Sequence, residues 1–538
     1  MNFPMKRFHL LLISCLFVAT SFAQGYSEQQ LASVLDSVST NPDYVIRWAD
    51  GAIAQNAKCA DAYFVKAFVF VAQEDYLQAL ELINKSLSLV SKKSVVSKSY
   101  VLCTRGAIYQ KVEDYDLALA DYTQAIAIDP KETDAYECRI NLYKDFQAYD
   151  KAEADCRTLL TIKDSLEYKL ELASLLTYQE KTDEALDILN KIIKYQPKLV
   201  TPYASRAWVN AVAGNGQAAI SDYISFMALE GDYSLDALVL YSSLDYTYAI
   251  GALSNLVSSD SENLTWLSAR IRVNIAQEDY EAALTDLDVL ETVADKSPFT
   301  LYQRAQCYQG MYEFSKQVDA MTALIALMET EDADLYTMRG VAYRNTGNTD
   351  AAFADFDKAL QISPTSSHTL AERGWTKYML KKDEAALKDF TTAITYAEPN
   401  AWLYVQRGSI YQCLGDSVKA KTDFEMAMQL DTVSSTYAFA LVHLGKKQQA
   451  INVMKAIVAE NTEDAGEHYD LACLYSLANM KSESIIALKR AVELGYKGFH
   501  HMQFDRDLDN IREEQGYKDI LANITKSKVS KMLEGFSK

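Results

Sequence analysis

Hydrophobic and small residues recur along most of this chain with the period of amphipathic helices, and the predicted helices come in pairs. Residues 105–130, RGAIYQKVEDYDLALADYTQAIAIDP, form one full unit, in which two helical runs flank a polar turn and Pro130 ends the second run. The same pattern returns at 339–364 and 406–431. Because alternating apolar and polar runs are scarce, the pattern predicts an all-α fold.

A small or aliphatic residue within each first helix marks the repeat, and most successive markers are 33 to 35 residues apart. The markers are Ala67, Gly106, Ile140, Ala173, Ala207, Ala237, Ile271, Ala305, Gly340, Gly374, Gly408, Ala438 and Ala472. The exceptions are a 39-residue step after Ala67 and 30-residue steps to Ala237 and Ala438. We therefore expect an insertion at 90–99, as a loop or an extended helix end, and short units near 230–263 and 431–464.

A period of about 34 residues with two helices per unit resembles the tetratricopeptide repeat family. The resemblance implies an all-α, right-handed α-solenoid of about thirteen repeats over residues 60–497. Residues 24–59 would supply N-terminal capping helices, in which Ser27 and Gln30 predict a capping box. Residues 498–538 would form a C-terminal cap and a polar tail.

An arginine and an aspartate recur sixteen residues apart in seven of the units. The pairs are Arg105 with Asp121, Arg139 with Asp155, Arg206 with Asp222, Arg270 with Asp286, Arg339 with Asp355, Arg373 with Asp389, and Arg407 with Asp423. Because both residues are equally far from the turn, two antiparallel helices would place them opposite each other, so we predict structural ion pairs. Partly exposed pairs add little stability, and we expect these pairs to set register instead.

One arginine breaks this pattern. Arg304 faces Ala320, with Asp319 as the nearest substitute, and this makes Arg304 a candidate for a functional role.

The family resemblance also implies that first helices line a concave binding face. It places His368, Ala371, Trp375, Tyr378 and Met379 on that face from one unit, and Trp402, Val405, Ser409, Gln412 and Cys413 from the next. Trp208 takes the same slot as Trp375 in an earlier unit. Since aromatic anchors are typical of binding hot spots, Trp208, Trp375, Tyr378 and Trp402 are our candidate partner-binding residues, together with Arg304. The alternative is that each ring packs against the neighbouring helix.

The N-terminus has the features of a secretory signal peptide over residues 1–23. Lys6 and Arg7 precede an apolar run, and Ser21-Phe22-Ala23 offers a cleavage site. The alternative is a lipoprotein anchored at Cys15, although the apolar run continues beyond that residue. We therefore expect an exported bacterial protein, periplasmic or associated with the cell envelope, with no integral membrane segment after signal removal.

Charge and motifs restrict the chemistry. Removal of residues 1–23 changes the formal charge from −20 to −22, which disfavours nucleic acid as a partner. No phosphate loop, Gly-x-Ser-x-Gly or His-Glu-x-x-His motif occurs, so we expect no enzyme, no cofactor and no metal. His500 and His501 are adjacent and would point apart on a helix. The seven cysteines beyond the signal are widely spaced, so we expect them to be small buried residues between helices. The alternative is one disulfide, for which Cys138 with Cys156 is the only candidate.

These observations predict a non-enzymatic protein–protein interaction scaffold that binds a protein or peptide in the concave groove. The alternative is a ligand- or glycan-binding component of the cell envelope built on helical repeats, since aromatic platforms also suit sugars.

Overall fold

The computed structural model describes residues 27–230, 235–260, 263–294 and 296–524. The predicted signal peptide, Cys15 and most of the polar tail lie outside these residues. Across the described ranges the regular structure is helical and contains no strand, which confirms the all-α prediction. None of the helices in these ranges is long and apolar enough to cross a membrane.

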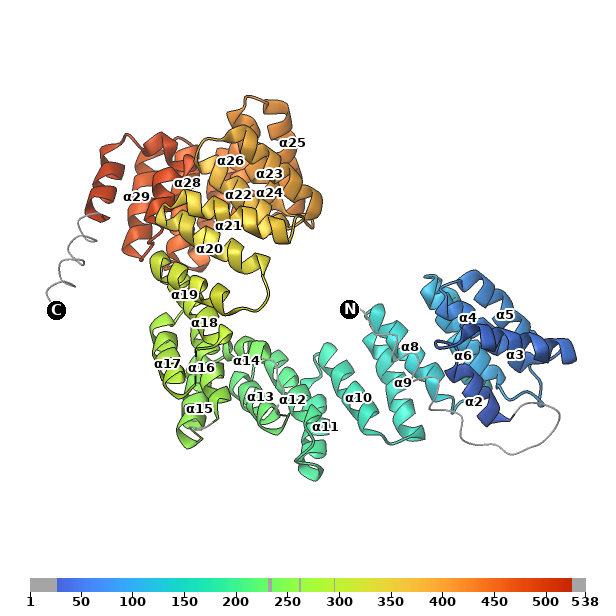
Figure 1. The fold of residues 1–538 in the computed structure, drawn as a ribbon. Coiled ribbons are helices and arrows are strands. Elements are labelled where there is room, and N and C mark those ends of the chain that lie inside the picture. The colour runs from blue at the N-terminus through green and yellow to red at the C-terminus, as the bar shows by residue number, and fades with distance from the viewer. Residues whose placement is uncertain (1–26, 231–234, 261–262, 295, 525–538) are drawn as a thin grey trace. The chain divides into compact units, whose positions relative to one another are not determined.

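The chain divides into two compact units, residues 1–249 and 250–538, coloured blue to green and green to red in Figure 1. Unit 1 contains α2 (Glu28–Asp36), α3 (Pro42–Gln55), α4 (Ala60–Ala72), α5 (Tyr76–Leu89), α6 (Lys98–Lys111), α7 (Tyr115–Ile128), α8 (Thr133–Asp145), α9 (Tyr149–Ile162), α10 (Leu166–Tyr178), α11 (Thr182–Tyr195), α12 (Thr201–Val212), α13 (Gly216–Glu230) and α14 (Leu235–Ser242). The boundary falls within α15 (Tyr246–Ser259).

Unit 2 continues in the same manner and ends in a short helix and a 3-10 turn. Its elements are α16 (Leu264–Ala276), α17 (Tyr280–Val293), α18 (Pro298–Gly310), α19 (Phe314–Leu327), α20 (Ala333–Thr346), α21 (Thr349–Ile362), α22 (Ser367–Met379), α23 (Asp383–Tyr396), α24 (Ala401–Cys413), α25 (Ser417–Leu430), α26 (Ser435–His443), α27 (Lys447–Glu460), α28 (Ala465–Leu477), α29 (Lys481–Glu493), α30 (Phe499–Phe504) and η1 (Arg506–Ile511). In the described residues, the twenty-six helices from α4 to α29 follow one another as thirteen successive first and second helices, as the repeat count predicts.

The residue size at the marker position matches the residue opposite it on the second helix. A Cβ atom added at Gly340 would lie 2.7 Å from the ring of Phe356, and one at Gly106 would lie 2.7 Å from the ring of Tyr122. Where the marker is larger, the opposite residue is smaller, as at Ile140, which shares a core cluster with Cys156. At these three pairs, close packing therefore depends on the two volumes together rather than on either residue alone.

Most arginines of the recurring pairs link three helices. Arg139 donates from Nε and Nη2 to the two carboxylate oxygens of Asp155, both at 2.7 Å, and from Nη1 to Thr123 of the preceding pair at 3.1 Å. Arg373 repeats the arrangement with Asp389 and Asp357. The forked guanidinium thus sets both the register within a pair and the stacking on the previous pair.

The aspartates of these pairs lie deeper than partly exposed ion pairs would. Arg105 donates from Nε and Nη2 to the two carboxylate oxygens of Asp121, both at 2.7 Å, and Arg407 bonds Asp423 in the same way at 2.8 Å. Asp121 and Asp423 are each only 4 % exposed, whereas the two arginines are half-buried. In these two pairs the aspartate is therefore buried while the arginine stays partly exposed. Removal of the arginine alone would leave a buried carboxylate without its ion-pair partner, which costs more than removal of both residues.

The irregular steps have local causes. The first helices of the two short units, α14 and α26, have 8 and 9 residues, against 12 to 14 in the other pairs of the solenoid. Residues 90–97 form a loop, so the insertion is not an extended helix end. The buried Asp61 carboxylate accepts hydrogen bonds from the backbone N–H groups of Val95 and Val96, at 3.2 and 2.9 Å, and so anchors this loop.

Two further sequence predictions can be compared with the structure. The capping box at the start of α2 is confirmed, because Ser27 and Gln30 exchange hydrogen bonds between side chain and backbone. The candidate disulfide is wrong: Cys138 and Cys156 are free thiols, like the other five described cysteines. Cys156 is buried and donates its thiol proton to the Tyr168 carbonyl oxygen, so it serves as a small core residue.

Candidate partner-binding surface

Five aromatic residues of unit 1 form a row along the ends of the first helices and the starts of the second helices. This unit 1 aromatic row consists of Tyr115, Phe146, Tyr149, Tyr178 and Trp208. The ring of Tyr115 meets that of Phe146 edge-on at 5.2 Å between centroids, and Tyr149 stacks on Tyr178 at 4.8 Å. Tyr178 then meets Trp208 edge-on at 5.2 Å. The contacting rings thus form two groups, one of Tyr115 and Phe146 and one of Tyr149, Tyr178 and Trp208, and the row crosses four consecutive helix pairs.

The row is open to solvent over much of its length. Phe146 is 57 % exposed and Tyr178 is 51 % exposed, whereas Trp208 is half-buried and packs against the core cluster of α8 to α12. Val212 is also exposed at the end of α12. Contiguous exposed apolar side chains of this kind mark interaction surfaces more often than isolated ones do.

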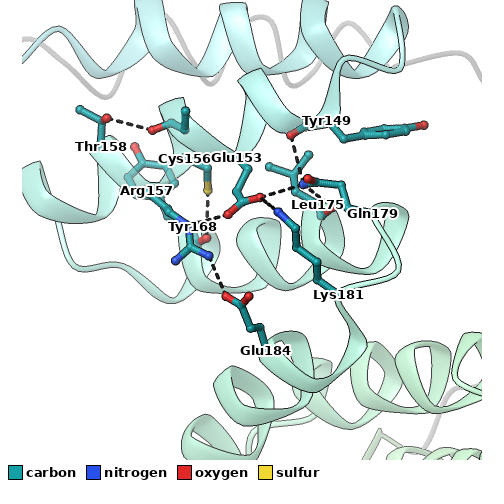
Figure 2. A network of polar contacts seen from close by, with 11 residues as sticks. Tyr149, Glu153, Cys156, Arg157, Thr158, Tyr168, Leu175, Gln179, Lys181 and Glu184 are labelled. Atoms are coloured by element: carbon teal, nitrogen blue, oxygen red, sulfur yellow. Dashed lines mark hydrogen bonds and ion pairs between the residues drawn. The ribbon is translucent and has the colours of Figure 1, made fainter.

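A polar network around Glu153 joins α9 to the turn after α10 and contacts the backbone of Tyr149, one of the two stacked residues (Figure 2). The Gln179 amide donates to the backbone oxygens of Tyr149 and Leu175 and to Glu153 Oε2, and so ties the end of α10 to the start of α9. Lys181 donates to the same carboxylate oxygen at 2.8 Å, and Arg157 donates to the other at 2.7 Å. The neighbouring rings thus rest on a turn that is fixed by hydrogen bonds.

The charge of Glu153 is stabilised by this network. Burial of the carboxylate would raise its pKa, but the hydrogen bonds from Lys181, Arg157 and Gln179 outweigh burial and lower the pKa to about 2. Glu153 is therefore ionised at every physiological pH. Glu153 in turn pairs with both cations that contact it, Lys181 and Arg157, and Arg157 also donates to Glu184 at 3.0 Å.

Acidic residues lie beside the row. Asp116, Asp150 and Asp183 each occupy the first turn of a second helix, in α7, α9 and α11. All three are exposed, and within the described part of the chain none has an ion-pair partner. The row therefore combines exposed ring faces with uncompensated negative charge.

Unit 2 brings together the aromatic residues that the sequence placed on the concave face. The ring of Trp375 lies 5.6 Å from that of Tyr378 and 6.2 Å from that of Trp402, and Trp402 also contacts Phe390. These rings are not open, however. Tyr378 is only 5 % exposed, and Trp375 and Trp402 are half-buried.

The covering element is the C-terminal part of unit 2 itself. We call residues 496–511 the C-terminal clasp; it contains α30 and η1. One side of the clasp is apolar, since Met502, Leu508 and Ile511 are buried in the core cluster of α26 to α29. The other side reaches back to α20 and α22, where the ring of His501 lies 6.1 Å from that of Trp375. Burial lowers the pKa of His501, partly offset by Asp505, so its ring is neutral at physiological pH.

Arg506 links the clasp to α22, α23 and α24. Its guanidinium lies over the ring of Tyr378 at 4.4 Å and donates to Asp383 Oδ1 at 2.5 Å. It also donates to the Tyr378 carbonyl oxygen at 3.4 Å and to the Cys413 sulfur at 3.0 Å. Earlier in the unit, the ring of Tyr496 meets that of Tyr312 at 6.0 Å. The predicted groove around Trp375 is therefore occupied by the chain's own clasp.

Comparison with known proteins places the repeats in a family. Residues 99–132 and residues 333–366 each match the tetratricopeptide repeat model. The first match covers the pair α6 and α7 and the second the pair α20 and α21, so each unit contains a matched repeat. The chain is a tetratricopeptide repeat protein.

The relatives of this tetratricopeptide repeat protein are distant. Human tetratricopeptide repeat protein 6 is 26 % identical over 211 residues, which is 38 % of this chain and 36 % of that protein. Human protein O-mannosyl-transferase TMTC1 is 27 % identical over 120 residues, 22 % of this chain and 14 % of that protein. A solved tetratricopeptide repeat protein from Parabacteroides merdae shares 18 % identity over 52 % of this chain and 98 % of that chain, with a TM-score of 0.32. The chain thus covers well under half of the length of its two human relatives.

The repeats of this protein indicate a protein–protein interaction scaffold. Their described residues contain no group of three His, Cys, Asp or Glu side chains that could hold a metal ion. His500 and His501 point apart: the ring of His500 lies near Gly347, and that of His501 near Trp375.

Arg304 is explained by the same stacking contact as the other arginines. It donates to Asp288 at 2.5 Å and to Glu291 at 3.0 Å, both on the preceding second helix, rather than to Asp319. The expected substitute was therefore wrong. Because Ala320 on α19 has no carboxylate, Arg304 forms no ion pair within the described residues of its own helix pair. Its ion pairs are with α17 of the preceding helix pair. Burial would lower its pKa, but the two carboxylates outweigh this and raise it.

Sequence reasoning missed most of the unit 1 aromatic row. Of its members only Trp208 was a candidate, because the family's slots drew attention to the middle of the first helix. The family's slots could nevertheless have identified Tyr178. It lies five residues after its marker Ala173, which is the concave-face slot that Met379 occupies five residues after Gly374. Phe146 lies one position further, in the turn, where no slot pattern would have selected it.

Proposed function

We propose that this protein is a non-enzymatic interaction scaffold of the cell envelope and that it holds a protein or peptide partner on the unit 1 aromatic row. The exposure of Phe146 and Tyr178 carries the proposal, because large rings held in an open position are suited to anchor a partner. Rigid anchors lose little conformational freedom on binding, which favours affinity.

The equivalent surface of unit 2 supports the choice of unit 1. Trp208 and Trp375 occupy the same slot, but the clasp covers the face around Trp375. A partner that approached Tyr378 would have to displace Arg506 from both the ring and Asp383. The row in unit 1 needs no such displacement.

The cell-envelope part of the proposal is supported by the sequence of residues 1–23, with its basic start, apolar run and small-residue site before Gln24. Export also agrees with the acidic balance of the mature chain, which suits soluble partners better than nucleic acid. Fusion of residues 1–23 to a reporter enzyme that is active only after export would test this part, and an inactive reporter would overturn it.

The binding part is tested by capture. The mature chain and its Phe146→Ala/Tyr178→Ala variant would be used to pull partners from the native envelope, with identification by mass spectrometry. We expect a partner set that the wild-type chain captures and the variant loses. Tyr195→Ala is the matched control, because Tyr195 is 79 % exposed but lies at the end of α11, outside the row.

Circular dichroism and thermal melting would show whether the variant keeps its helices. Equal capture by the folded variant and the wild type would remove the row as the site. A thermal shift with a glycan, and no captured protein, would instead favour the ligand-binding alternative.

A further inference from the structure

We infer that the unit 1 aromatic row binds arginine side chains of its partner, each guanidinium held between a ring and a carboxylate in the first turn of a second helix. This inference rests on the proposed function, since it names the chemistry of the partner at that same surface. The expected occupant is a basic protein segment with more than one arginine, rather than an acidic segment or a purely apolar one.

Unit 2 contains an intramolecular contact of this kind, made by Arg506. Arg506 is placed over the ring of Tyr378 and is hydrogen-bonded to Asp383, the first residue of α23. Both contacts come from one turn of one repeat, because the ring lies near the end of the first helix and the carboxylate at the start of the second. A guanidinium suits such a place, since its flat face stacks on the ring while its edge donates to the carboxylate.

Unit 1 has an exposed ring and an exposed carboxylate close together in sequence at three of its turns. Asp183 follows Tyr178 by five residues, as Asp383 follows Tyr378, although the first pair sits one position later in its repeat. Asp150 follows Phe146 by four residues, and Asp116 lies next to Tyr115. Ring and carboxylate therefore recur in three successive helix pairs, which would let one segment place several arginines along the row.

Three neighbouring cations of unit 1 are bound to other carboxylates, and Lys151 lies over the ring of Tyr143 at 5.7 Å. Lys181 is bound to Glu153, Lys144 to Glu171 at 2.6 Å, and Arg157 to Glu153 and Glu184. The carboxylates of Asp116, Asp150 and Asp183 are therefore available to a cation of another molecule. In unit 2 the charge of Asp383 is matched in cis by Arg506.

The test uses the mature full chain and three synthetic helical peptides labelled with fluorescein. The first carries three arginines and two tyrosines on one face of an alanine- and glutamine-based helix; the second and third replace the arginines with lysines or with glutamates. Fluorescence anisotropy at two salt concentrations would measure binding.

We expect the arginine peptide to bind, the lysine peptide to bind about 3- to 30-fold more weakly, and the glutamate peptide not to bind. Asp183→Asn and Tyr178→Ala should each weaken the arginine peptide about 3- to 30-fold, while Tyr195→Ala should leave its affinity unchanged. Higher salt should weaken binding further. Equal affinity for the three peptides, or unchanged affinity in Asp183→Asn, would overturn the inference.

The two proposals fail in different ways. In one outcome, Phe146→Ala/Tyr178→Ala abolishes partner capture, but the arginine peptide neither binds nor competes with the captured partner. The row is then a partner site that does not recognise arginine, and only the inference is overturned. If capture is unaffected by that variant, the proposed site itself is overturned.

Discussion

The two units carry the same kind of surface in two different states. In unit 1, Tyr178 beside Trp208 is half exposed and rests on the network around Glu153. In unit 2, Tyr378 beside Trp375 is buried under the clasp. Trp208 and Trp375 share a slot and Tyr178 and Tyr378 lie one position apart in their repeats, yet the rings lie on an open surface in unit 1 and in an internal packing surface in unit 2. The position of an aromatic residue in its repeat therefore does not decide whether the ring is accessible to a partner. Its accessibility depends on whether another segment of the chain covers it.

The largest expected difference is between Tyr378→Ala and Tyr178→Ala. Removal of the buried ring should destabilise the surrounding helices by about 3–5 kcal/mol, whereas removal of the exposed ring should change stability by less than about 1 kcal/mol. Hydrogen exchange of α22 to α24 and of α10 to α12 would measure this locally, because long repeat arrays do not unfold in one step. Equal effects would mean that the clasp does not seal unit 2.

The recurring ion pairs should not distinguish the units. A double-mutant cycle on Arg339 and Asp355 in unit 2 and one on Arg105 and Asp121 in unit 1 should give similar coupling energies, about 1–3 kcal/mol, because both pairs have the same two short hydrogen bonds and buried aspartates. Urea titration with local hydrogen exchange would provide the four stabilities of each cycle. Absence of coupling in either unit would show that the arginine fork does not set register.

Loss of the clasp contact should open unit 2. In Arg506→Ala the Asp383 carboxylate loses its partner and Tyr378 loses its cover, and the contact should weaken by about 2 kcal/mol. Tryptophan fluorescence quenching by acrylamide should then rise, since Trp375 lies beside the clasp. Arg506→Lys should give a smaller rise, and an unchanged quenching rate would contradict the role of the clasp as a cover.

The network behind the open row should respond to acid. Because the pKa of Glu153 is lowered to about 2 in the fold, its contribution to stability is present above the ordinary glutamate value and is lost as the pH falls toward 2. The contribution should amount to about 1–2 kcal/mol, since Arg157 and Lys181 are half exposed and screened. Melting from pH 7 to pH 2.5 should show α9 to α11 losing less stability in Glu153→Gln than in the wild type.

The smallest effect concerns the turns themselves. Glu180 has a left-handed backbone with φ of 59°, and one turn of unit 2 has Gly347 at the corresponding position, with φ of 85°. Glu180→Gly should therefore stabilise unit 1 by about 0.5–1 kcal/mol, because glycine adopts this conformation without a Cβ clash. A thermal melt would measure the gain, and a loss of stability would indicate that the Glu180 side chain contributes contacts of its own.

The repeat architecture was predictable because its causes are local. The 34-residue period, the marker opposite an aromatic residue at Gly340 and Phe356, and the spacing of Arg339 and Asp355 all depend on residues within one hairpin. The first-helix slots were likewise sufficient to bring Trp375, Tyr378 and Trp402 together.

Two features of the arginine pattern could not be predicted in this way. Arg304 takes its carboxylates from the preceding repeat, which no spacing within one hairpin reveals. The depth of Asp121 and Asp423 was also missed, because burial depends on the neighbouring helices that cover a hairpin and not on the hairpin's own sequence.

The sequence by itself determined the helices, their pairing and the ion pairs, since hydrophobic period, turn chemistry and residue volume act over some thirty residues. Tertiary structure decided which aromatic surface stays open. Arg506 meets Asp383 across 123 residues of chain, and no local pattern links the two. The solenoid brings them together only after its repeats have stacked, and by doing so it covers the face around Trp375, whereas the rings of Phe146 and Tyr178 in unit 1 stay exposed.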